Sequence, residues 1–363
     1  MNLKPASQSL FILCSLLLMA VTIACGNLNQ SNKDNQPVQV KHDNRWLTFT
    51  SGVRVILEDS KGNTWFGSDN EGVCLLHNGE FRYFTTANGL TNNQVRCIYE
   101  DINGITWFEC GNGLSTYDGQ KMSVYKERNY DAVNQWKVSA GDLWFKGDEL
   151  AGNYLLEKGP GVYQYDGNKL SFRRFPVTQA SDNERSFRYA ISTHFVKSKN
   201  GTIWFGTYKT LFGYNGSAFR IITDEDLAQQ GVSGTLHVRD IMEDSKGNLW
   251  IANNGSGVFK YDGKEIINFT AQHKLKKEDT NGNSLERAFS IGEDRAGNMW
   301  FGTVGSGAWK YDGTTVTNFS KEDGLESDHI WSIYTTKQRA VWLAGARPSG
   351  VYQFNGKSFE RIY

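Results

Sequence analysis

The chain has 363 residues, of which 39% are hydrophobic and 13% aromatic, with 38 Gly and only 5 Pro. Its 39 basic and 39 acidic residues balance, so the formal net charge is zero. A general nucleic-acid-binding protein carries a basic excess, so this balance argues against nucleic acid as a partner.

The N-terminus predicts a secretory signal peptide over residues 1–25. One Lys precedes an apolar run over 10–24, which is shorter than the ~20 residues of a membrane-spanning helix. Residues 22–26, Thr-Ile-Ala-Cys-Gly, resemble a bacterial lipobox in which Cys25 is the lipidated residue. The alternative is an ordinary signal peptide with an incidental Cys.

Residues 26–45 predict a disordered tether, because they are polar, rich in Asn and without hydrophobic periodicity. About 20 such residues span roughly 25 Å as a flexible coil. We therefore expect a protein of a bacterial cell envelope, held at the membrane through its lipid anchor and either periplasmic or surface-exposed.

Seven copies of one unit fill residues 46–363, and together they predict a single domain. Each copy has a Trp, preceded at the third position by Gly in six copies and by Arg339 in the seventh. An Asp-Gly or Asn-Gly dipeptide follows each Trp. The units average about 44 residues, the period of a β-propeller blade. The repeated Trp residues are Trp65, Trp107, Trp144, Trp204, Trp250, Trp300 and Trp342.

The unit at 238–270 shows how one blade is built. VRDIMED, NLWIAN, GVFKYDG and KEIINFT predict strands a, b, c and d, which are rich in β-branched and aromatic residues. Asp-Gly and Asn-Gly favour hairpin turns in which both central residues have positive φ. Because one sheet cannot bury both faces alone, we predict an all-β, seven-bladed β-propeller of four-stranded blades. Each Trp is then buried between neighbouring blades and removes roughly 200 Å² from water.

Two features of the unit pattern leave alternatives open. Residues 45–52 and 357–363 both resemble a strand d, which gives eight such strands for seven blades. We predict that 46–50 pairs with the last blade and closes the ring. Three Cys residues in the body cannot all pair with one another and lack the spacing of a zinc site, so we interpret them as small core residues, with a disulfide left open. They are Cys74, Cys97 and Cys110.

The segments VRCIYEDINGITWFECGNGLSTYDG and VRDIMEDSKGNLWIANNGSGVFKYDG, with the linker FTTANGLTNNQ, resemble the two-component regulator propeller repeat. The resemblance covers residues 46–363 and rests on V-x-x-I-x-E-D, the Gly turn, the Trp, a Gly-rich loop, YDG and the FT…GL linker. In that family the propellers often form periplasmic sensors of hybrid histidine kinases, and many respond to glycans. The resemblance implies a sensor of a small-molecule or glycan ligand. Because no kinase or receiver segment follows Tyr363, we expect a separate membrane signalling partner.

Loop lengths predict on which face a ligand binds. All large insertions fall in b–c and d–a connections, which open on one face of a propeller, and loops that vary on a fixed scaffold commonly carry binding sites. Strand a is innermost and begins at that face. Its second position, aligned on the Trp, holds Arg54, Arg96, Val133, Thr193, Arg239, Phe289 and Trp331.

We predict that Arg54, Arg96 and Arg239 line the mouth of the central channel. Phe289 and Trp331 are expected opposite them, and His194 and His237 nearby. Arginine gives bidentate contacts to carboxylates and aromatic rings offer flat apolar faces, so the set suits an anionic or sugar ligand. The alternative is that these arginines pair with acidic neighbours such as Glu58, Glu100 and Glu243.

Signals of catalysis are weak. The sequence has no G-x-S-x-G, H-E-x-x-H or P-loop motif, and we predict a non-catalytic protein without a metal or other cofactor. One alternative is a lyase or hydrolase resembling the streptogramin lyases, although the Glu of their W-F-x-E pattern is absent here. A second alternative is a scaffold that binds another protein. Glu109 and Lys146, which replace small residues in adjacent units, predict a local ion pair.

Overall fold

The computed structural model describes residues 46–127, 129–130, 134–146, 160–176, 189–280 and 282–363. The predicted signal peptide, the lipobox Cys25, the tether 26–45 and Val133 lie outside these residues, as do most of 146–161 and 176–190. Within the described part of the chain, no helix combines the length and hydropathy needed to cross a membrane.

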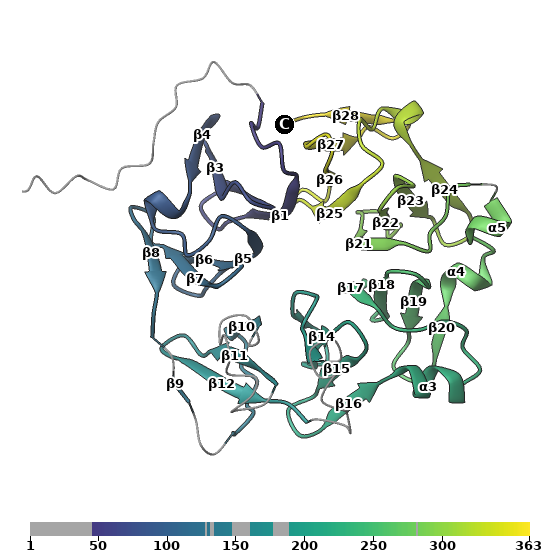
Figure 1. Ribbon diagram of the computed structural model, residues 1–363, viewed down its shortest axis with the longest axis horizontal. Coiled ribbons are helices and arrows are strands. Elements are labelled where there is room, and N and C mark those ends of the chain that lie inside the picture. Colours follow the sequence, from purple (N-terminus) through teal and green to yellow (C-terminus); the bar gives the residue numbers. More distant parts are fainter. Residues whose placement is uncertain (1–45, 128, 131–133, 147–159, 177–188, 281) are drawn as a thin grey trace, which may run out of the picture. The chain divides into compact units, whose positions relative to one another are not determined.

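Seven four-stranded sheets follow one another around a central axis (Figure 1). Blades 1 and 2 consist of β1 (Val53–Glu58), β2 (Thr64–Ser68), β3 (Val73–His77), β4 (Glu80–Phe84), β5 (Val95–Glu100), β6 (Thr106–Cys110), β7 (Gly113–Tyr117) and β8 (Met122–Tyr125). Blades 3 and 4 consist of β9 (Asn129–Tyr130), β10 (Leu143–Lys146), β11 (Gly161–Tyr165), β12 (Leu170–Arg174), β13 (Val196–Lys197), β14 (Ile203–Gly206), β15 (Leu211–Tyr214) and β16 (Phe219–Ile222).

Blades 5, 6 and 7 complete the ring. They consist of β17 (Val238–Glu243), β18 (Leu249–Asn253), β19 (Gly257–Tyr261), β20 (Ile266–Asn268), β21 (Ala288–Glu293), β22 (Met299–Thr303), β23 (Ala308–Tyr311), β24 (Val316–Phe319), β25 (Ile330–Thr335), β26 (Val341–Gly345), β27 (Gly350–Phe354) and β28 (Phe359–Arg361). The predicted seven-bladed propeller of four-stranded blades is confirmed, and β17 to β20 lie within the four strands predicted for 238–270, although Phe269 and Thr270 at the end of the last one are helical.

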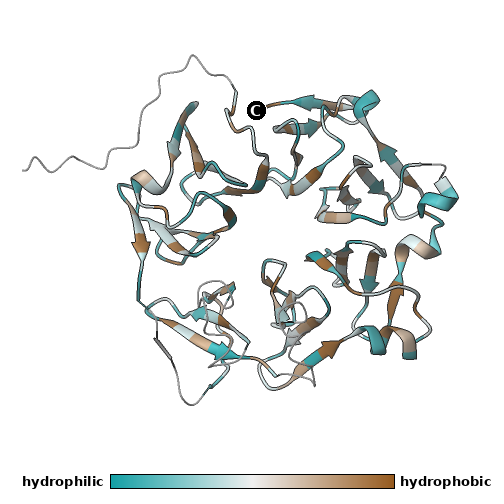
Figure 2. Cartoon of the chain, viewed as in Figure 1, coloured by the Kyte–Doolittle hydropathy of each residue, from teal (hydrophilic) through white to brown (hydrophobic). Residues whose placement is uncertain are grey.

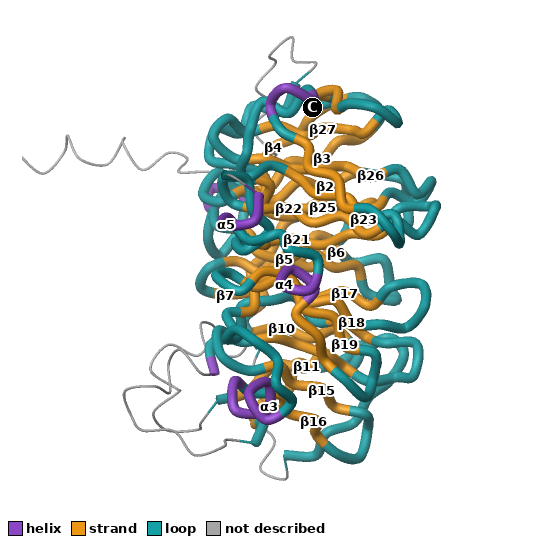
Figure 3. The backbone as a smooth tube through the Cα atoms, turned by 90° about the vertical axis from the view of Figure 1, so that its right-hand side faces the viewer, coloured by secondary structure: helices purple, strands orange, loops and turns teal. Residues whose placement is uncertain are grey.

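Short helices occur only in connections between strands of the described residues. They are η1 (Thr86–Asn88), α3 (Asp224–Gln229), α4 (Phe269–Gln272), α5 (Lys277–Thr280) and η2 (Lys321–Asp323). Each lies in a d–a connection between consecutive blades. In the side view of Figure 3, α3 and α5 lie on the same side of the ring. This agrees with the prediction that insertions gather on one face.

The repeated Trp residues pack between neighbouring blades, as predicted. Trp65 of blade 1 is fully buried and lies 5.0 Å from the ring of Phe108 and 5.2 Å from that of Tyr117, both in blade 2. Every blade carries hydrophobic residues on its strands (Figure 2), and the buried clusters join one blade to the next. Side-chain packing between sheets therefore holds the ring together.

The Asp of the V-x-x-I-x-E-D motif binds the Trp of its own blade. In blade 5, one carboxylate oxygen of Asp244 accepts hydrogen bonds from Trp250 Nε1 at 2.8 Å and from Asn248 Nδ2 at 2.8 Å. The other oxygen accepts from the backbone N–H groups of Lys246 and Asn248 and so closes the a–b turn. The same Asp–Trp bond recurs from Asp59, Asp101 and Asp294.

The Glu of the same motif joins adjacent blades. Glu100 accepts hydrogen bonds from the Ser60 N–H at 2.7 Å and the Ser60 hydroxyl at 2.6 Å in the preceding blade. Glu243 accepts likewise from the Lys199 N–H at 2.8 Å. These carboxylates therefore serve the turns of neighbouring blades, and the acidic neighbour that pairs with a channel arginine is instead Asp69, which binds Arg54.

The ring closes differently from the prediction. Residues 46–50 form no strand, and β28, from the C-terminus, is the fourth strand of blade 7. The short turn at Asn355 and Gly356 places β28 beside β27 at little cost in loop entropy. Leu47 and Phe49 are instead buried at the seam between blades 1 and 7. Glu58 completes the seam by accepting from the Lys337 N–H at 2.6 Å.

The c–d turns also differ from the prediction. Both central residues have positive φ only at Asn78 (φ 51°) and Gly79 (φ 80°) among the described turns. Elsewhere only the Gly does, as at Gly263 with φ 97°, which fits a type II′ turn. Asp262 directly precedes this Gly, and its Oδ1 accepts hydrogen bonds from the backbone N–H groups of Lys264 and Glu265, both at 2.8 Å. The Asp therefore caps the turn and does not occupy its left-handed position.

Blade 3 departs from the predicted strand order. Its fourth strand, β9, pairs in parallel with the outer strand β12, and β10 is the innermost described strand. Asn134 Oδ1 accepts from the Arg174 N–H at 2.6 Å, and Trp136 Nε1 donates to the Arg174 carbonyl at 2.8 Å. These bonds hold 134–136 beside the outer strand, where the predicted inner strand a cannot form.

Candidate anion site on the propeller axis

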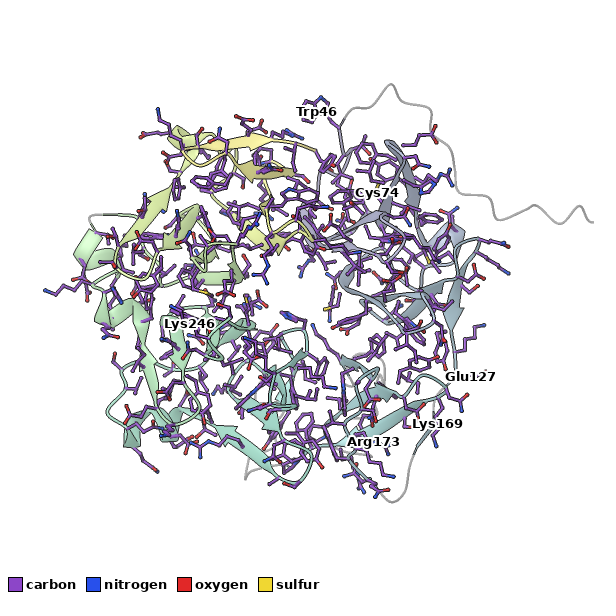
Figure 4. All side chains as sticks on the ribbon, turned by 180° about the vertical axis from the view of Figure 1, so that it is seen from behind. Trp46, Cys74, Glu127, Lys169, Arg173 and Lys246 are labelled. Carbon is purple, nitrogen blue, oxygen red and sulfur yellow. The ribbon has the colours of Figure 1, made fainter. Side chains whose placement is uncertain are left out.

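A cavity of about 880 Å³ lies on the axis of the ring and receives residues from all seven blades. The ring is seen from behind in Figure 4, with side chains around the central opening. The lining includes Arg54, Arg96, Arg239, Phe289, Trp331 and His194, all of which were predicted to gather there. The structure thus places six of the seven predicted residues on one cavity.

A repeated β-bulge aims the second residue of strand a into this cavity. In blade 1, Val53 pairs with Ser68 and Val55 with Gly67, so Arg54 has no partner on β2. The same irregularity occurs in β5, β17, β21 and β25. A bulge of this kind re-aims a side chain, which explains why these five positions face the channel. The bulged residues are Arg54, Arg96, Arg239, Phe289 and Trp331.

On the side of blades 1 and 2, the two arginines have polar partners within the protein. Arg54 Nε donates to Asp69 Oδ1 at 2.5 Å. Arg96 donates to Gln94 Oε1 from Nε at 3.0 Å and from Nη2 at 2.8 Å. Gln94 Nε2 in turn lies 3.5 Å from Asp69 Oδ1, so one small network joins both arginines.

On the side of blades 5 to 7, the arginines differ from those of blades 1 and 2 because their charges are not paired with carboxylates in the described residues. The Arg239 guanidinium lies 4.5 Å from the ring centre of Phe289 and 5.3 Å from that of Tyr208. Arg287 and Arg347 also line the cavity. Among the described residues, none of these three arginines forms an ion pair with a carboxylate.

The prediction that Phe289 and Trp331 lie opposite the arginines is wrong, because each ring lies against an arginine. Arg239 lies over Phe289, and Arg54 lies 5.2 Å from the ring centre of Trp331. Each pair comes from the bulged positions of adjacent blades, with blades 1 and 7 adjacent through ring closure. The aromatic faces therefore hold guanidinium groups in place by cation–π attraction. This leaves less aromatic surface for the stacking of a sugar ring.

His194 forms a second polar pair within the cavity. Its Nδ1 donates to Asp240 Oδ1 at 3.0 Å, and its side chain is 41% exposed to the channel. Burial lowers the pKa of His194, but the charge of Asp240 and the hydrogen bond to it outweigh this effect and raise the pKa above its usual value. Asp240 also accepts from the Ile291 N–H at 2.9 Å, which ties blade 5 to blade 6.

His237 lies behind the cavity wall. Its ring contacts that of Tyr208 at 5.0 Å, and it is not among the lining residues. Burial and then the charge of Arg239 lower the pKa of His237. A neutral His237 fits a supporting position beside Arg239 better than direct contact with an anion.

The predicted pair of Glu109 and Lys146 is present and buried, with 3.9 Å between Lys146 Nζ and Glu109 Oε1. In the other blades, the second residue after the repeated Trp has to be small. A Cβ on Gly67 would lie 2.6 Å from Val55 and 2.9 Å from Val95 of the next blade. Glu109 and Lys146 lie on β6 and β10 of adjacent blades, at the corresponding position of each blade.

The three cysteines are buried, and none forms a disulfide within the described chain. Cys97 also lines the cavity, whereas Cys110 packs between blades 1 and 2. Burial raises the pKa of Cys97 to about 12. The thiol therefore stays protonated at neutral pH and is a poor nucleophile.

The residues that sequence reasoning missed lie outside the strand-a alignment. Arg287 directly precedes β21, His329 directly precedes β25, and Tyr208 and Arg347 lie in b–c connections. Arg347 has φ 63°, a left-handed conformation that few non-glycine residues adopt. Only the predicted location of the binding face could have pointed to them. Asp240 was missed because no equivalent strand-a residue is acidic.

Comparisons with known proteins agree with this architecture. Residues 231–255 match the family model described as two component regulator propeller. A search among curated proteins gave no match. The extracellular domain of the hybrid two component system BT4673 from B. thetaiotaomicron superimposes with a TM-score of 0.57 at 20% identity, covering 85% of this chain and 39% of that one. This chain thus spans about two fifths of that structure.

Two lyase structures have the same fold over most of their length. A streptogramin B lyase gives a TM-score of 0.58 at 13% identity, covering 87% of this chain and 96% of the lyase. A catalytically inactive virginiamycin B lyase from Staphylococcus aureus, solved with quinupristin, gives 0.57 at 16% identity and covers 84% and 96%. At these identities the likeness establishes the fold alone. The chain is therefore a seven-bladed β-propeller in which residues 231–255, at blade 5, match the two component regulator propeller model.

Proposed function

We propose that this protein is a non-catalytic sensor or binding protein of a bacterial cell envelope, and that its axial cavity binds an anionic small molecule or glycan. The single observation that supports this proposal is the charge of the cavity. Its lining includes five arginines, and Asp240 is the one acidic residue among the described lining residues. The five are Arg54, Arg96, Arg239, Arg287 and Arg347.

The positive charge of the cavity lining favours the binding of an anion. Like charges on the walls of one cavity repel each other, and a cavity with low-dielectric walls focuses their field. An anion that enters relieves the repulsion and gains charge-assisted hydrogen bonds, which are about twice as strong as neutral ones. Such a site attracts anions from solution and discriminates against neutral analogues.

The cellular setting is part of the proposal. The resemblance to extracellular domains of two component systems supports a position outside the cytoplasm. A lipid anchor at Cys25 would hold the domain at the membrane, and a separate membrane protein would carry any signal onward. Metabolic labelling with a fatty-acid analogue tests the anchor, because the label should be lost in the Cys25→Ser variant.

A binding screen tests the ligand. Glycans and metabolites are offered as matched neutral and anionic pairs, and the protein's melting temperature and calorimetric binding are recorded. The proposal predicts that anionic members raise the melting temperature and that added salt weakens their binding. If only neutral members bind, the cavity's charge is not the basis of recognition.

One observation favours a second candidate, a lyase. The His194–Asp240 contact fixes one imidazole nitrogen and leaves Nε2 for a substrate, as a general base requires. Among the described residues, no group of three or more His, Cys, Asp or Glu side chains gathers as metal ligands. Assays with cyclic depsipeptides and acidic glycans, with and without Mg²⁺, decide the matter. Turnover that disappears in His194→Ala would establish the lyase.

A further inference from the structure

The charges at the mouth of the cavity are distributed unequally. On blades 1 and 2, Asp69 accepts a hydrogen bond from Arg54 Nε, and Gln94 accepts from Arg96 Nε and Nη2. On blades 5 to 7, no carboxylate of the described residues pairs with Arg239, Arg287 or Arg347. The two sides therefore differ in whether the arginines that an incoming anion meets already have polar side-chain partners in the protein.

The backbone brings the second group together at consecutive blades. Asn254 of blade 5 forms a β-bridge with Arg287 at the start of blade 6. Val304 of blade 6 forms the same bridge with His329 at the start of blade 7, and the Ala346 N–H donates to the His329 carbonyl at 3.0 Å. Arg347 follows directly. The repeated bridges thus set Arg287, His329 and Arg347 along one arc of the mouth.

Acidic groups close to this arc are engaged elsewhere. Glu286 accepts from the Lys277 N–H at 3.1 Å and from the Ser284 hydroxyl at 3.2 Å. Asp328 lies 3.9 Å from Lys321 Nζ and 3.8 Å from His329 Nε2, so it offsets at most part of one charge. Asp240 is bound by His194. The arc keeps a net positive charge.

We propose that Arg239, Arg287 and Arg347 form a subsite for a doubly charged oxyanion, and that its natural ligand is a phosphate monoester. This inference rests on the proposed function and specifies its ligand. A single carboxylate carries one charge and two oxygens in one plane, whereas three guanidinium groups arrive from three blades. A phosphate monoester has three terminal oxygens and a charge of about −1.5 to −2 at neutral pH. It satisfies forked donors from several directions and neutralises more of their charge.

Two features of the subsite prepare it for such a ligand. Phe289 and Tyr208 hold the Arg239 guanidinium between them, and its Nε is buried without a hydrogen-bond partner in the protein. Arg347 is kept in a left-handed backbone conformation, as residues at ligand sites often are. Side chains held in place before the ligand arrives lose less conformational entropy when they bind it.

The test is calorimetric titration of the protein with four probes: glucose 6-phosphate, inorganic phosphate, glucuronate and glucose. We expect both phosphates to bind, glucuronate to bind at least about tenfold more weakly because it has half the charge, and glucose not to bind. Tighter binding of glucose 6-phosphate than of inorganic phosphate would assign a phosphorylated sugar. Equal or weaker binding of glucose 6-phosphate would support the oxyanion subsite but contradict a phosphate monoester as its natural ligand.

Single variants separate the two sides of the mouth. Arg239→Gln, Arg287→Gln and Arg347→Gln should each weaken glucose 6-phosphate by about tenfold or more. Arg54→Gln should weaken it less than any of these, and Arg220→Gln, on the outer strand β16, serves as the control for general charge. Melting curves without ligand check folding, and Arg287→Gln and Arg347→Gln should not lower the melting temperature, because neither arginine forms an ion pair within the described residues.

Other outcomes distinguish this inference from the proposed function. If glucuronate binds as tightly as glucose 6-phosphate, or if Arg54→Gln loses as much affinity as Arg287→Gln, the phosphate subsite is wrong and the anion-binding cavity stands. If no anion binds to the folded protein, both proposals are wrong.

Discussion

The guanidinium group of Arg239 lies 4.5 Å above the ring of Phe289, and both residues occupy the bulged position of strand a on adjacent blades. The bulge turns both side chains toward the axis, where they meet. Arg54 and Trp331 repeat this relationship across the seam between blades 1 and 7. One backbone irregularity, used five times, therefore places five large side chains on the cavity wall.

Replacing Phe289 by Leu tests the role of the aromatic ring. The variant keeps apolar volume but loses the π-face that holds Arg239, so the free energy of anion binding should weaken by about 0.5–1.5 kcal/mol. Phe289→Tyr keeps the face and should bind normally. Calorimetric titration with the tightest anion of the screen measures both variants, and equal affinities for Leu and Tyr would show that the stacking is incidental.

Replacing Arg339 by Gly should stabilise the fold. Arg339 has φ 63° at the a–b turn position where the six other blades have Gly, five of them with positive φ, and a left-handed residue with a Cβ costs about 1–2 kcal/mol. Relief of this strain should raise the melting temperature. Gly247→Ala is the reverse control, because its added Cβ meets nothing within 4 Å and only φ 86° opposes it. A lower melting temperature for Arg339→Gly would show that the arginine side chain stabilises the turn.

The hydrogen-bonded carboxylate of Asp244 should make the stability of the fold depend on pH in the acid range. Burial raises its pKa, but hydrogen bonds from Asn248 and Trp250 outweigh burial and hold the pKa below the usual value. The stabilisation is therefore complete above the unfolded pKa of about 3.9 and is lost as the pH falls toward the folded pKa. Asp244→Asn should cost about 1–3 kcal/mol at pH 7 and reduce the dependence of stability on pH below 5 or so.

Asp262→Asn is the matched control for that experiment. Asp262 caps an exposed c–d turn, and Asn215 makes the same bonds in blade 4. We expect urea unfolding at pH 7 to give nearly the wild-type stability. If both Asn variants unfold alike, the Asp–Trp bond has no special weight.

Glu58→Ala tests ring closure. Glu58 accepts from the backbone N–H of Lys337 and lies 3.4 Å from the Tyr334 hydroxyl, so it joins the first blade to the last. Its removal leaves a donor at the seam unsatisfied and should cost about 1–3 kcal/mol. Glu80, whose side chain is 73% exposed, provides a control whose Ala variant should unfold normally. An unchanged midpoint for Glu58→Ala would place closure in the apolar packing alone.

The blades were predictable because each repeated residue has a local task. The Trp fills the space between sheets, the Gly enters the left-handed region, and the Asp caps its own turn. The shared position of Arg54, Arg96 and Arg239 followed from aligning these marks. The alternation of hydrophobic and polar residues does not show where a β-bulge occurs. The direction of the bulged side chains could therefore not be predicted from the bulge.

Other parts depended on tertiary choices between equivalent segments. Residues 46–50 and 359–361 have similar strand patterns, and the short hairpin beside β27 decides in favour of the latter. In blade 3, hydrogen bonds from Asn134 and Trp136 to the backbone of Arg174 hold 134–136 beside the outer strand. The repeat pattern of the sequence does not predict these bonds. Arg287 and Arg347 lie in connections, where an alignment of strands assigns no position.

The most direct test of the anion-binding cavity is to locate a bound anion. Crystals grown with selenate, a tetrahedral dianion with a strong anomalous signal, should show selenium on the propeller axis within hydrogen-bond distance of Arg239, Arg287 and Arg347. The peak should vanish in crystals of the variant with all three arginines replaced by Gln. Selenium found only on the outer surface, or an axial peak that persists in the triple variant, would contradict the account.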